Sequence, residues 1–344
     1  MSSRQRIQFS APGEVEVVTE PLPEVGPDEV RVRTRYSAIS PGTERLVYEG
    51  RVPESLAVDS SIDALQDDEF SYPISYGYAA VGVVEAVGKS VTDQWEGQTV
   101  FSFQPHVSDF VASPPALVRL PPSVELTDAV MIPSLETAMN LVMDGRPMIG
   151  EIVVVFGQGI VGLLTTRLLA QHPLGALYTV EPSAPRRKQS ASMGAKAVGT
   201  VSDLELTERS DAGPSPDDGS SEGADLLYEL TGRPSVLNDV IPRAGFSGRI
   251  VVGSWYGTKT APIALGAKFH RSRTQIISSQ VSTIAPSLRG RWTKDRRMSV
   301  VLDLLSEIEP GHLISHRFPV EDAPTAYEQL GDDPSVLQPI FEYD

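Results

Sequence analysis

The sequence contains no cysteine, and this absence removes several kinds of chemistry at once. Disulfides, thiolate zinc sites and cysteine nucleophiles are all excluded. Lysine is scarce too: it supplies only six of the 29 basic residues, against 45 Asp and Glu. This imbalance suits a protein dissolved in concentrated salt, and it equally suits an acidic surface encoded by a GC-rich genome. The net charge of -16 argues against nucleic acid or an anionic membrane as a partner.

Long hydrophobic runs are also missing. No apolar run reaches the roughly 18 residues that span a bilayer, and the start "MSSRQRIQFS" lacks the apolar core of a secretory signal. We therefore expect a cytoplasmic protein with no membrane partner. The 344 residues exceed the size, roughly 250 to 300 residues, at which a single core stops growing, so two domains are expected.

The first 120 residues contain short apolar runs punctuated by Pro and Gly, without helical periodicity. This pattern is typical of a β domain. The expected strands cover residues 14–20, 29–38, 79–88, 97–103, 109–114 and 116–121.

From residue 151 onward, apolar strands alternate with helical runs, which predicts a parallel α/β sheet. The expected strands are 151–157, 176–181, 224–232 and 248–257, and the expected helices are 159–172, 184–195 and one near 234–244. The chain then ends with a helix at about 295–308, a strand at 312–320, a helix at 321–330 and a strand at 337–344. The polar, acidic stretch 204–225 is interpreted as a solvated surface insertion that forms no core.

The most specific local signal is "VVVFGQGIVGLLTTRLLA", which places Gly157, Gly159 and Gly162 in G-x-G-x-x-G spacing between a strand and a helix. This arrangement is typical of a dinucleotide site: the glycines permit a tight turn, close approach of the backbone to a pyrophosphate, and close packing of helix on strand. Ile160 and Val161 begin the helix, whose N-terminus favours phosphate.

Glu181 stands at the end of the next strand, 19 residues beyond Gly162. A carboxylate there can accept both ribose hydroxyls of NAD and would repel a 2'-phosphate, so we expect NAD. NADP stays open, because Arg186 and Arg187 follow and could pair with a phosphate. The alternative for both arginines, and more so for Arg187, is a solvated helix start.

Together these stretches resemble the medium-chain dehydrogenase/reductase superfamily, which contains the zinc alcohol dehydrogenases and quinone reductases. The resemblance rests on "GYAAVGVVEAVGKSV", "WEGQTVFSF", "LVRLPPSVE", "VVVFGQGIVGLLTTRLLA", "ADLLYELTG" and "GRIVVGSWYG". It implies a GroES-like catalytic domain, residues 1–135 with 281–344, and a doubly wound Rossmann domain, residues 136–280, with the active site in the cleft. It also places Thr137, Thr231, Gly232, Ser254 and Ser279 near the cofactor. We expect a homodimer acting on a small-molecule substrate.

The zinc members carry three catalytic ligands that this sequence replaces. By the resemblance, Ser40 stands at a ligand cysteine, with Thr43 and Glu44 following, and Tyr78 stands at a ligand histidine. The third position falls within "MIPSLETA", where only Ser134 or Glu136 offers oxygen, and the structural zinc lobe is absent. The sequence therefore resembles a zinc-lacking branch that includes hydroxyethyl bacteriochlorophyllide dehydrogenase, which oxidises a secondary alcohol to a ketone. No metal is expected.

Without zinc, hydroxyl groups must stabilise the developing charge and move the proton. We interpret Tyr78 as the proton donor or acceptor, with Ser40 or Thr43 as a relay. Aromatic packing is the alternative for Tyr78, and loop capping is the alternative for Ser40. Glu44 is expected to keep a structural role near the cofactor or an arginine.

His106 is expected at the surface, with a position facing the cleft as the alternative. The basic segment 288–297 is expected to be a solvated helix start, and a substrate entrance is its alternative.

Three classes of function remain open from the sequence. The first is a metal-free NAD(P)-dependent oxidoreductase acting on an alcohol/carbonyl pair or on an activated C=C bond. The second is an enzyme that binds a metal through Glu44, His106 and Glu136. The third is a dinucleotide-binding sensor or scaffold without catalysis.

Overall fold

The computed structural model of the chain describes residues 3–53, 62–65, 70–206, 223–333 and 335–344. The chain divides into two compact units, Met1–Pro133 with Ser299–Asp344, and Ser134–Met298. The return to the first domain is predicted to begin at residue 281, whereas residues 281–298 belong to the second unit. The acidic stretch expected as an insertion lies outside the described residues from 207 to 222.

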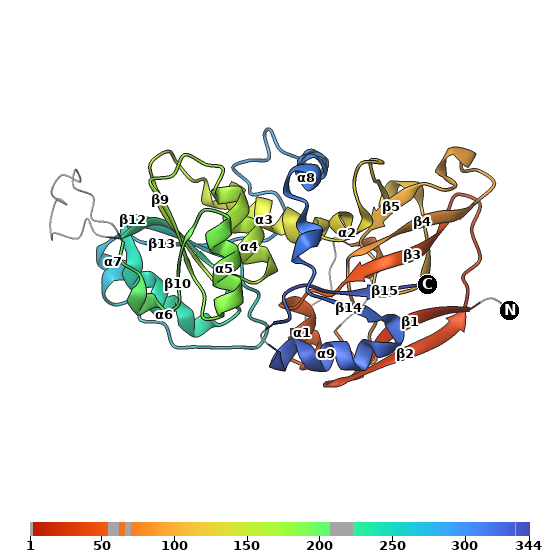
Figure 1. The fold of residues 1–344 in the computed structure, drawn as a ribbon, viewed down its shortest axis with the longest axis horizontal. Coiled ribbons are helices and arrows are strands. Elements are labelled where there is room, and N and C mark those ends of the chain that lie inside the picture. The colour runs from red at the N-terminus through yellow and green to blue at the C-terminus, as the bar shows by residue number, and fades with distance from the viewer. Residues whose placement is uncertain (1–2, 54–61, 66–69, 207–222, 334) are drawn as a thin grey trace. The chain divides into compact units, whose positions relative to one another are not determined.

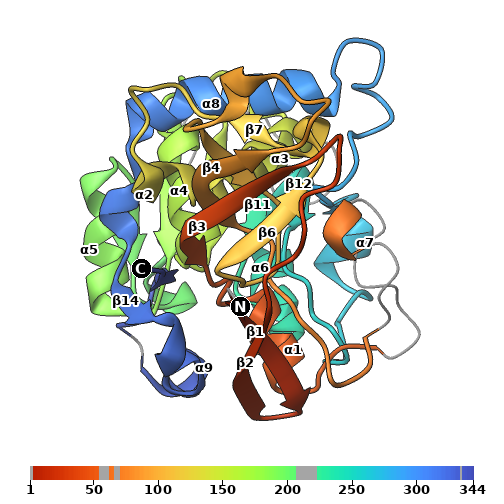
Figure 2. The same cartoon turned by 90° about the vertical axis from the view of Figure 1, so that its right-hand side faces the viewer.

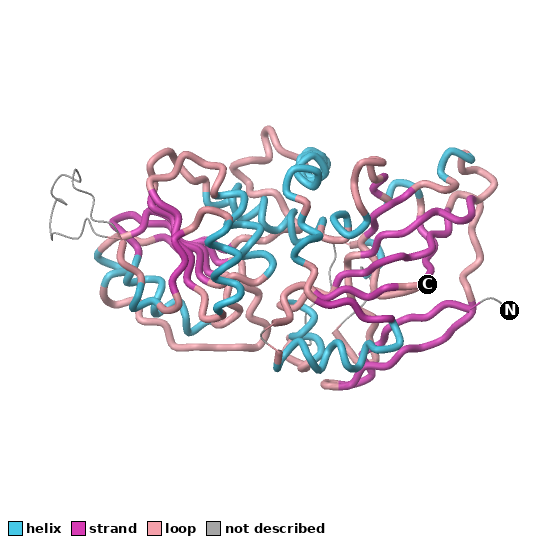
Figure 3. Tube along the Cα trace, in the orientation of Figure 1, coloured by secondary structure: helices cyan, strands magenta, loops and turns pink. Residues whose placement is uncertain are grey.

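The second unit contains a six-stranded parallel sheet in the order β10-β9-β8-β11-β12-β13 (Figures 1 and 3). The order reverses between the adjacent strands β8 and β11, the point at which doubly wound folds bind ligands beyond the carboxyl ends of the strands. The strands are β8 (Ile152–Phe156), β9 (Ala176–Val180), β10 (Lys196–Val198), β11 (Ala224–Glu229), β12 (Ala244–Val252) and β13 (Gln275–Ser278).

Both faces of this sheet are covered, because all five residues of β8 are buried. Val153 and Val155 pack in a cluster with Leu141 and Leu169, from the helices α3 and α4. Val154 lies in a second cluster with residues of α6. The helices of this part of the chain are α3 (Ile132–Gly145), α4 (Ile160–Leu169), α5 (Ala184–Ser192), α6 (Leu237–Val240), α7 (Lys268–Arg271) and α8 (Lys294–Ile308).

The first unit is built on a mixed sheet in the order β14-β15-β3-β4-β5-β7, with β6 paired to β3 (Figures 1 and 2). A separate antiparallel hairpin joins β1 (Ser3–Ala11) to β2 (Glu14–Pro21). The other strands are β3 (Val30–Ala38), β4 (Ala80–Val87), β5 (Thr99–Ser102), β6 (Asp109–Ala112), β7 (Val118–Arg119), β14 (His316–Pro319) and β15 (Pro339–Glu342). The helices are α1 (Thr43–Tyr48), α2 (Leu126–Ala129) and α9 (Ala323–Asp332).

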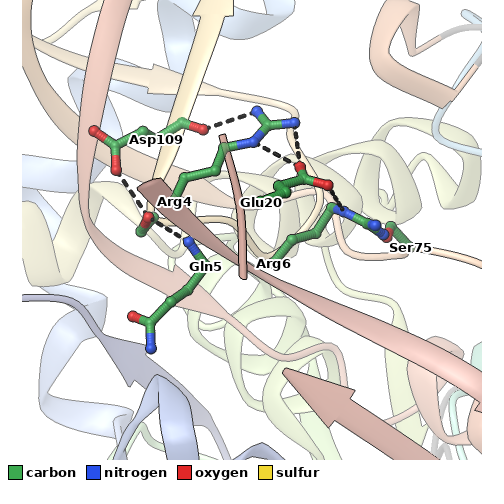
Figure 4. A network of polar contacts seen from close by, with 7 residues as sticks. Arg4, Gln5, Arg6, Glu20, Ser75 and Asp109 are labelled. Carbon is green, nitrogen blue, oxygen red and sulfur yellow. Dashed lines mark hydrogen bonds and ion pairs between the residues drawn. The ribbon is translucent and has the colours of Figure 1, made fainter. Parts of the chain in front are cut away.

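Charged side chains fasten the β1-β2 hairpin (Figure 4). Arg4 and Arg6 both bond to Glu20 across the hairpin, and Arg4 also donates to the carbonyl of Asp109. Arg6 reaches Ser75. Burial alone would raise the pKa of Glu20, but the two arginines outweigh it and the pKa is lowered.

The predicted fold class is confirmed, with a mainly β unit and a parallel α/β unit. Three strands were not predicted, β1, β10 and β13. The helix expected near 234–244 consists instead of three short pieces: Pro234 begins the 3₁₀ turn before α6, and Pro242 is the second residue of the 3₁₀ turn after it. Leu204, at the start of the expected insertion, packs in the core of the second unit, which corrects the prediction that this stretch forms no core. None of the described helices is long and apolar enough to span a membrane.

Candidate functional site

The glycine turn, Gly157 to Gly162, has free space beside its central glycine, Gly159. Gly157 has φ +90°, and a Cβ there would lie 2.7 Å from the carbonyl oxygen of Leu230. A Cβ on Gly162 would lie 2.1 Å from the carbonyl oxygen of Gly157. The fold itself therefore requires these two glycines. Around Gly159, by contrast, an added Cβ would meet nothing within 4 Å, so the backbone faces free space where a phosphate can approach.

The helix that follows this turn presents uncapped N-H groups. Gly159 is the N-cap residue of α4 and offers no side chain to bond the first turn, which begins with Ile160 and Val161. The first N-H groups of a helix have no partner within the helix and carry the positive end of its dipole. The turn and the helix together fit the pyrophosphate of a dinucleotide.

Glu181 follows β9 and is 7% exposed. Its Oε2 accepts the backbone N-H of Gln158, in the glycine turn, at 2.8 Å, and its Oε1 accepts the N-H of Ser183, also at 2.8 Å. A carboxylate has about four acceptor positions, so each oxygen can still accept a ribose hydroxyl. Glu181 fits an NAD ribose and simultaneously fixes the turn that would hold the phosphates.

The two arginines after Glu181 lie in α5. Arg187 donates to the backbone carbonyls of Glu181 at 2.8 Å and Pro182 at 2.5 Å. Its side chain therefore stabilises the loop between β9 and α5 and is not simply solvated. Arg186 is partly buried on the same helix.

A buried carboxylate joins the loops that follow β11 and β12. Glu229 is fully buried and accepts the N-H of Thr231 at 2.8 Å, the hydroxyl of Thr231 at 2.5 Å and the hydroxyl of Tyr256 at 2.6 Å. Burial, together with the bond to Glu229, raises the pKa of Tyr256. Ser254 accepts the N-H of Gly232 at 2.9 Å. Thr231, Gly232 and Ser254, three predicted cofactor residues, therefore lie in one hydrogen-bonded group.

The remaining predicted cofactor residues of this unit are Ser279 and Thr137. Ser279 directly follows β13, and its N-H donates to the carbonyl of Val252 at 3.0 Å. Thr137 is partly buried on α3. With the exception of Thr137 and Arg186, the predicted cofactor residues all lie just beyond the carboxyl ends of β8, β9, β11, β12 and β13.

The first unit contains a buried polar cluster around Glu44 and His106, which are both 0% exposed. Oε2 of Glu44 contacts Nε2 of His106 at 2.9 Å and accepts the hydroxyl of Tyr327 at 2.5 Å. Oε1 of Glu44 accepts the backbone N-H of Ser40 at 2.8 Å. Nδ1 of His106 lies 2.6 Å from the hydroxyl of Ser37.

These contacts correct two predictions. His106 was expected at the surface, but both of its ring nitrogens are bonded in the interior, and its ring occupies the space beside Gly77, where a Cβ would come within 2.8 Å of it. Glu44 does have a structural role, but its partners are His106, Tyr327 and the Ser40 backbone and not an arginine.

The three predicted catalytic residues lie at one end of the mixed sheet. Ala38 N-H donates to the carbonyl of Ala79 at 2.9 Å, which places the chain before Ser40 beside the chain after Tyr78. Thr43 begins α1 in the same turn as Ser40. The Tyr78 ring is partly buried, packs against the core and meets Tyr76 edge to face at 6.0 Å.

The residues at the expected ligand positions differ from those of a zinc site of the family type. Zinc prefers thiolate and imidazole, whereas the hydroxyls of Ser40 and Tyr78 are poor ligands in their neutral forms. Glu136 is bonded to Arg297 at 2.8 Å, and Glu44 is bonded to His106. Among the residues that the structure describes, no three or more His, Cys, Asp or Glu are grouped so as to hold a metal ion.

The basic segment 288–297 is exposed at Arg289, Arg291, Lys294 and Arg296, as expected of a solvated helix start, but Arg297 departs from that prediction. Arg297 is 1% exposed and ion-paired to Glu136. Arg296 stacks on the ring of Trp292 at 4.2 Å. The sequence of a run of charged residues does not indicate which of its side chains is buried. The (i, i+4) spacing of Glu136 and Asn140 on α3 is the feature that could have indicated a buried partner for an arginine.

No protein-family model matches the chain. Sequence relatives nevertheless span nearly all of it. D-guloside 3-dehydrogenase of Escherichia coli (strain K12) is 22% identical over 323 residues, which cover 89% of each chain. The 2-desacetyl-2-hydroxyethyl bacteriochlorophyllide A dehydrogenase of Cereibacter sphaeroides is 22% identical over 354 residues, 97% of this chain and 96% of its own. Human sorbitol dehydrogenase is 23% identical over 358 residues, 92% of this chain and 90% of its own.

Solved structures share the fold over the whole length. An alcohol dehydrogenase from Escherichia coli CFT073 in complex with NADH has a TM-score of 0.75 at 19% identity, with 100% of both chains covered. A dehydrogenase from Sinorhizobium meliloti 1021 bound to NADP has a TM-score of 0.75 at 16% identity, again with 100% of both chains covered. In its sequence and in its fold, the chain is therefore similar to zinc-type alcohol dehydrogenase-like proteins of the medium-chain dehydrogenase/reductase superfamily.

Proposed function

We propose that the chain is an NAD(P)-dependent oxidoreductase that interconverts an alcohol and a carbonyl compound, prefers NAD(H), and works without a catalytic zinc. The observation that carries the proposal is the pairing of Glu181 with the glycine turn at Gln158, beside an open position at Gly159. This arrangement combines an acceptor for ribose hydroxyls with N-H groups for phosphates in a doubly wound sheet.

The residues that would hold the dinucleotide follow from this arrangement. Gly157 to Gly162 would bind the pyrophosphate, and Glu181 would bind the adenine ribose. The nicotinamide half of the dinucleotide would be bound by the loops that carry Thr231, Gly232, Ser254 and Ser279. When bound, the nicotinamide would accept or donate the hydride. The chain's own task is to orient the substrate oxygen and to move its proton.

Tyr78 is our candidate for that proton transfer, with Ser40 or Thr43 as the relay. The support is the resemblance to the zinc alcohol dehydrogenases, which implies that Tyr78 stands at a metal-ligand position, together with the location of all three residues at one end of the mixed sheet. A neutral phenol can donate a hydrogen bond to a developing alkoxide, and such general acid help contributes about 10² to 10⁴-fold.

The named relatives guide the choice of substrate, since they act on D-gulosides, sorbitol and a bacteriochlorophyllide carrying a hydroxyethyl group. We therefore propose a secondary alcohol as the substrate class. The test is a screen of polyols, glycosides and simple secondary alcohols with NAD and NADP, followed by the corresponding ketones with the reduced cofactors. Quinones and enones belong in the same screen.

Zinc is tested on the same preparation by elemental analysis and by assays in a strong chelator. We expect less than stoichiometric zinc and unchanged activity. About one zinc per chain, lost together with activity, would contradict a metal-free mechanism. Turnover of quinones or enones with none of the alcohols would instead indicate a C=C or quinone reductase, and dinucleotide binding without any turnover would indicate a sensor.

A further inference from the structure

Arg297 is among the largest fully buried side chains of the protein. Its guanidinium donates to Oε1 of Glu136 from Nε at 3.1 Å and from Nη2 at 2.8 Å. It also donates to Oδ1 of Asn140 at 2.6 Å and to the backbone carbonyl of Val281 at 2.6 Å. One side chain on α8 therefore binds both α3 and the segment that follows β13.

Residues of α3 hold the other end of the same segment. Asn140 donates to the hydroxyl of Ser279 at 3.0 Å and to Oδ2 of Asp144 at 3.0 Å, and Ser279 donates to the same Asp144 oxygen at 2.7 Å. Glu136, Asn140 and Asp144 are spaced by four, so they share one face of α3. The stretch 279–281 is thus fixed at Ser279 by α3 and at Val281 by Arg297.

The position of this stretch in the sheet connects it to the cofactor. The glycine turn and Glu181 follow β8 and β9, which assigns the phosphates and the adenine ribose to that half of the sheet. Doubly wound folds bind a dinucleotide across two halves, so the second half, β11 to β13, takes the nicotinamide. Residues 279–281 lie at the carboxyl end of β13, the outer strand of that half (Figure 1). Ser278 and Gln280 are exposed there.

We propose that Arg297 is a positioning residue that holds backbone 279–281 in place and thereby shapes the nicotinamide half of the cofactor site. This inference rests on the proposed function, and it adds a residue outside the glycine motif to the determinants of cofactor binding. Arg297 does not touch the cofactor in this proposal; it acts through Val281 and, by way of Asn140, through Ser279.

Stability alone does not account for a charge in this place. Burying an ion pair costs desolvation that its attraction repays only with good geometry, and well-packed apolar residues are often as stabilising. Burial raises the pKa of Glu136, and the charge of Arg297 opposes that rise. A guanidinium does provide what an apolar side chain lacks, namely donors aimed at three separate acceptors in fixed geometry.

The test compares the wild type with Arg297→Lys and with the double variant Arg297→Met/Glu136→Leu. The double variant removes both buried charges, so neither is left unpaired, and it should fold. Binding of NADH and of ADP-ribose is measured by calorimetry for each protein. ADP-ribose contains the adenosine half and both phosphates but no nicotinamide. The fluorescence of bound NADH reports the surroundings of the nicotinamide ring directly.

We expect the double variant to bind ADP-ribose within about twofold of the wild type and NADH about tenfold more weakly, with an altered fluorescence of the bound nicotinamide. Arg297→Lys should fall between the two, because an ammonium replaces the charge but not the fork of donors. Arg146→Met is the matched control: Arg146 is an exposed arginine whose bond to Ser287 reaches the same connecting segment, and its loss should leave both affinities unchanged.

Two outcomes would overturn the inference. Unchanged NADH affinity and fluorescence in the double variant would show that Arg297 does not position the nicotinamide half. An equal loss of affinity for both ligands would show a general structural role. Failure of the proposed function is distinct from both, since the wild type would then bind neither NADH nor ADP-ribose.

Discussion

The backbone N-H of Gln158 donates to Oε2 of Glu181 at 2.8 Å, so the residue expected to select the cofactor also holds the turn expected to bind its phosphates. The second oxygen of Glu181 is bonded in the same way to Ser183. The carboxylate is therefore fixed in place before any ligand arrives, and a ribose that binds it does not have to order the side chain.

Glu181→Ala should weaken NADH binding by about 30-fold, since hydrogen bonds to a charged acceptor contribute roughly 1.5 to 3 kcal/mol each. NADPH binding should fall much less, because the repulsion of a 2'-phosphate disappears at the same time. Titrations of both cofactors against the wild type and the variant measure the change. Lys188→Ala, which removes an exposed charge from the same helix α5, is the control. Tighter binding of NADPH than NADH by the wild type would contradict the preference for NAD.

Tyr78→Phe should lower kcat by about 10² or more, which corresponds to roughly 2.7 kcal/mol of transition-state stabilisation, while NADH affinity stays unchanged. The substitution removes only the hydroxyl and keeps the ring that packs against Tyr76. Steady-state kinetics on the substrate found by the screen measure the effect. Tyr48→Phe tests another partly buried tyrosine of the same apolar cluster and should leave kcat unchanged. Turnover of Tyr78→Phe within a few-fold of the wild type would assign Tyr78 to packing, and Ser40 or Thr43 would become the candidate.

Glu44→Gln should destabilise the first unit by about 3 kcal/mol. A carboxylate accepts all three of its present contacts, from the Ser40 N-H, the Tyr327 hydroxyl and the His106 ring, whereas an amide turns a donor toward one of them. Denaturant unfolding measures the loss. Glu49→Gln is the control, because Glu49 forms an (i, i+4) pair with Arg45 that lies partly in solvent and contributes about 0.3 to 0.5 kcal/mol. Equal stability of the Glu44 variant and the wild type would show that the charge at Glu44 is dispensable.

The glycine turn, Glu181 and the alternation of strands with helices could be predicted, because each depends on the pattern of residues within a short stretch of sequence. The turn needs three glycines within six residues between a strand and a helix, and such a pattern has few other causes. The strand β13 was missed because its exposed residues give no alternation of apolar and polar side chains.

The buried polar clusters could not be predicted, because their partners are distant in the chain. Glu44 meets His106 across 62 residues and Tyr327 across 283, and Arg297 meets Glu136 across 161. The sequence around a single histidine or arginine does not indicate such a distant partner. These residues usually lie at the surface, so a surface position is predicted for them. In this protein the fold overrides that preference at both positions.

Alkaline pH should unfold the protein through its buried tyrosines. Burial raises the pKa of Tyr228, Tyr327 and Tyr343 above the ordinary value of 10.0, with nearby carboxylates adding to the rise, and it also raises the pKa of Tyr256. A raised pKa in the folded state means that the folded protein keeps protons that the unfolded chain has lost above pH 10.0. The stability that these groups contribute is therefore fully present below pH 10.0 and declines as the pH rises beyond it.

The measurement is a titration of tyrosinate absorbance together with circular dichroism. We expect a first group of tyrosines to ionise near the ordinary value while the fold persists, and the buried group to ionise only together with loss of the folded signal. Tyr256→Phe should reduce the steepness of the alkaline transition, since one ionisation linked to unfolding is removed. Full ionisation of all ten tyrosines near the ordinary value, with the folded signal intact, would contradict the burial of these side chains.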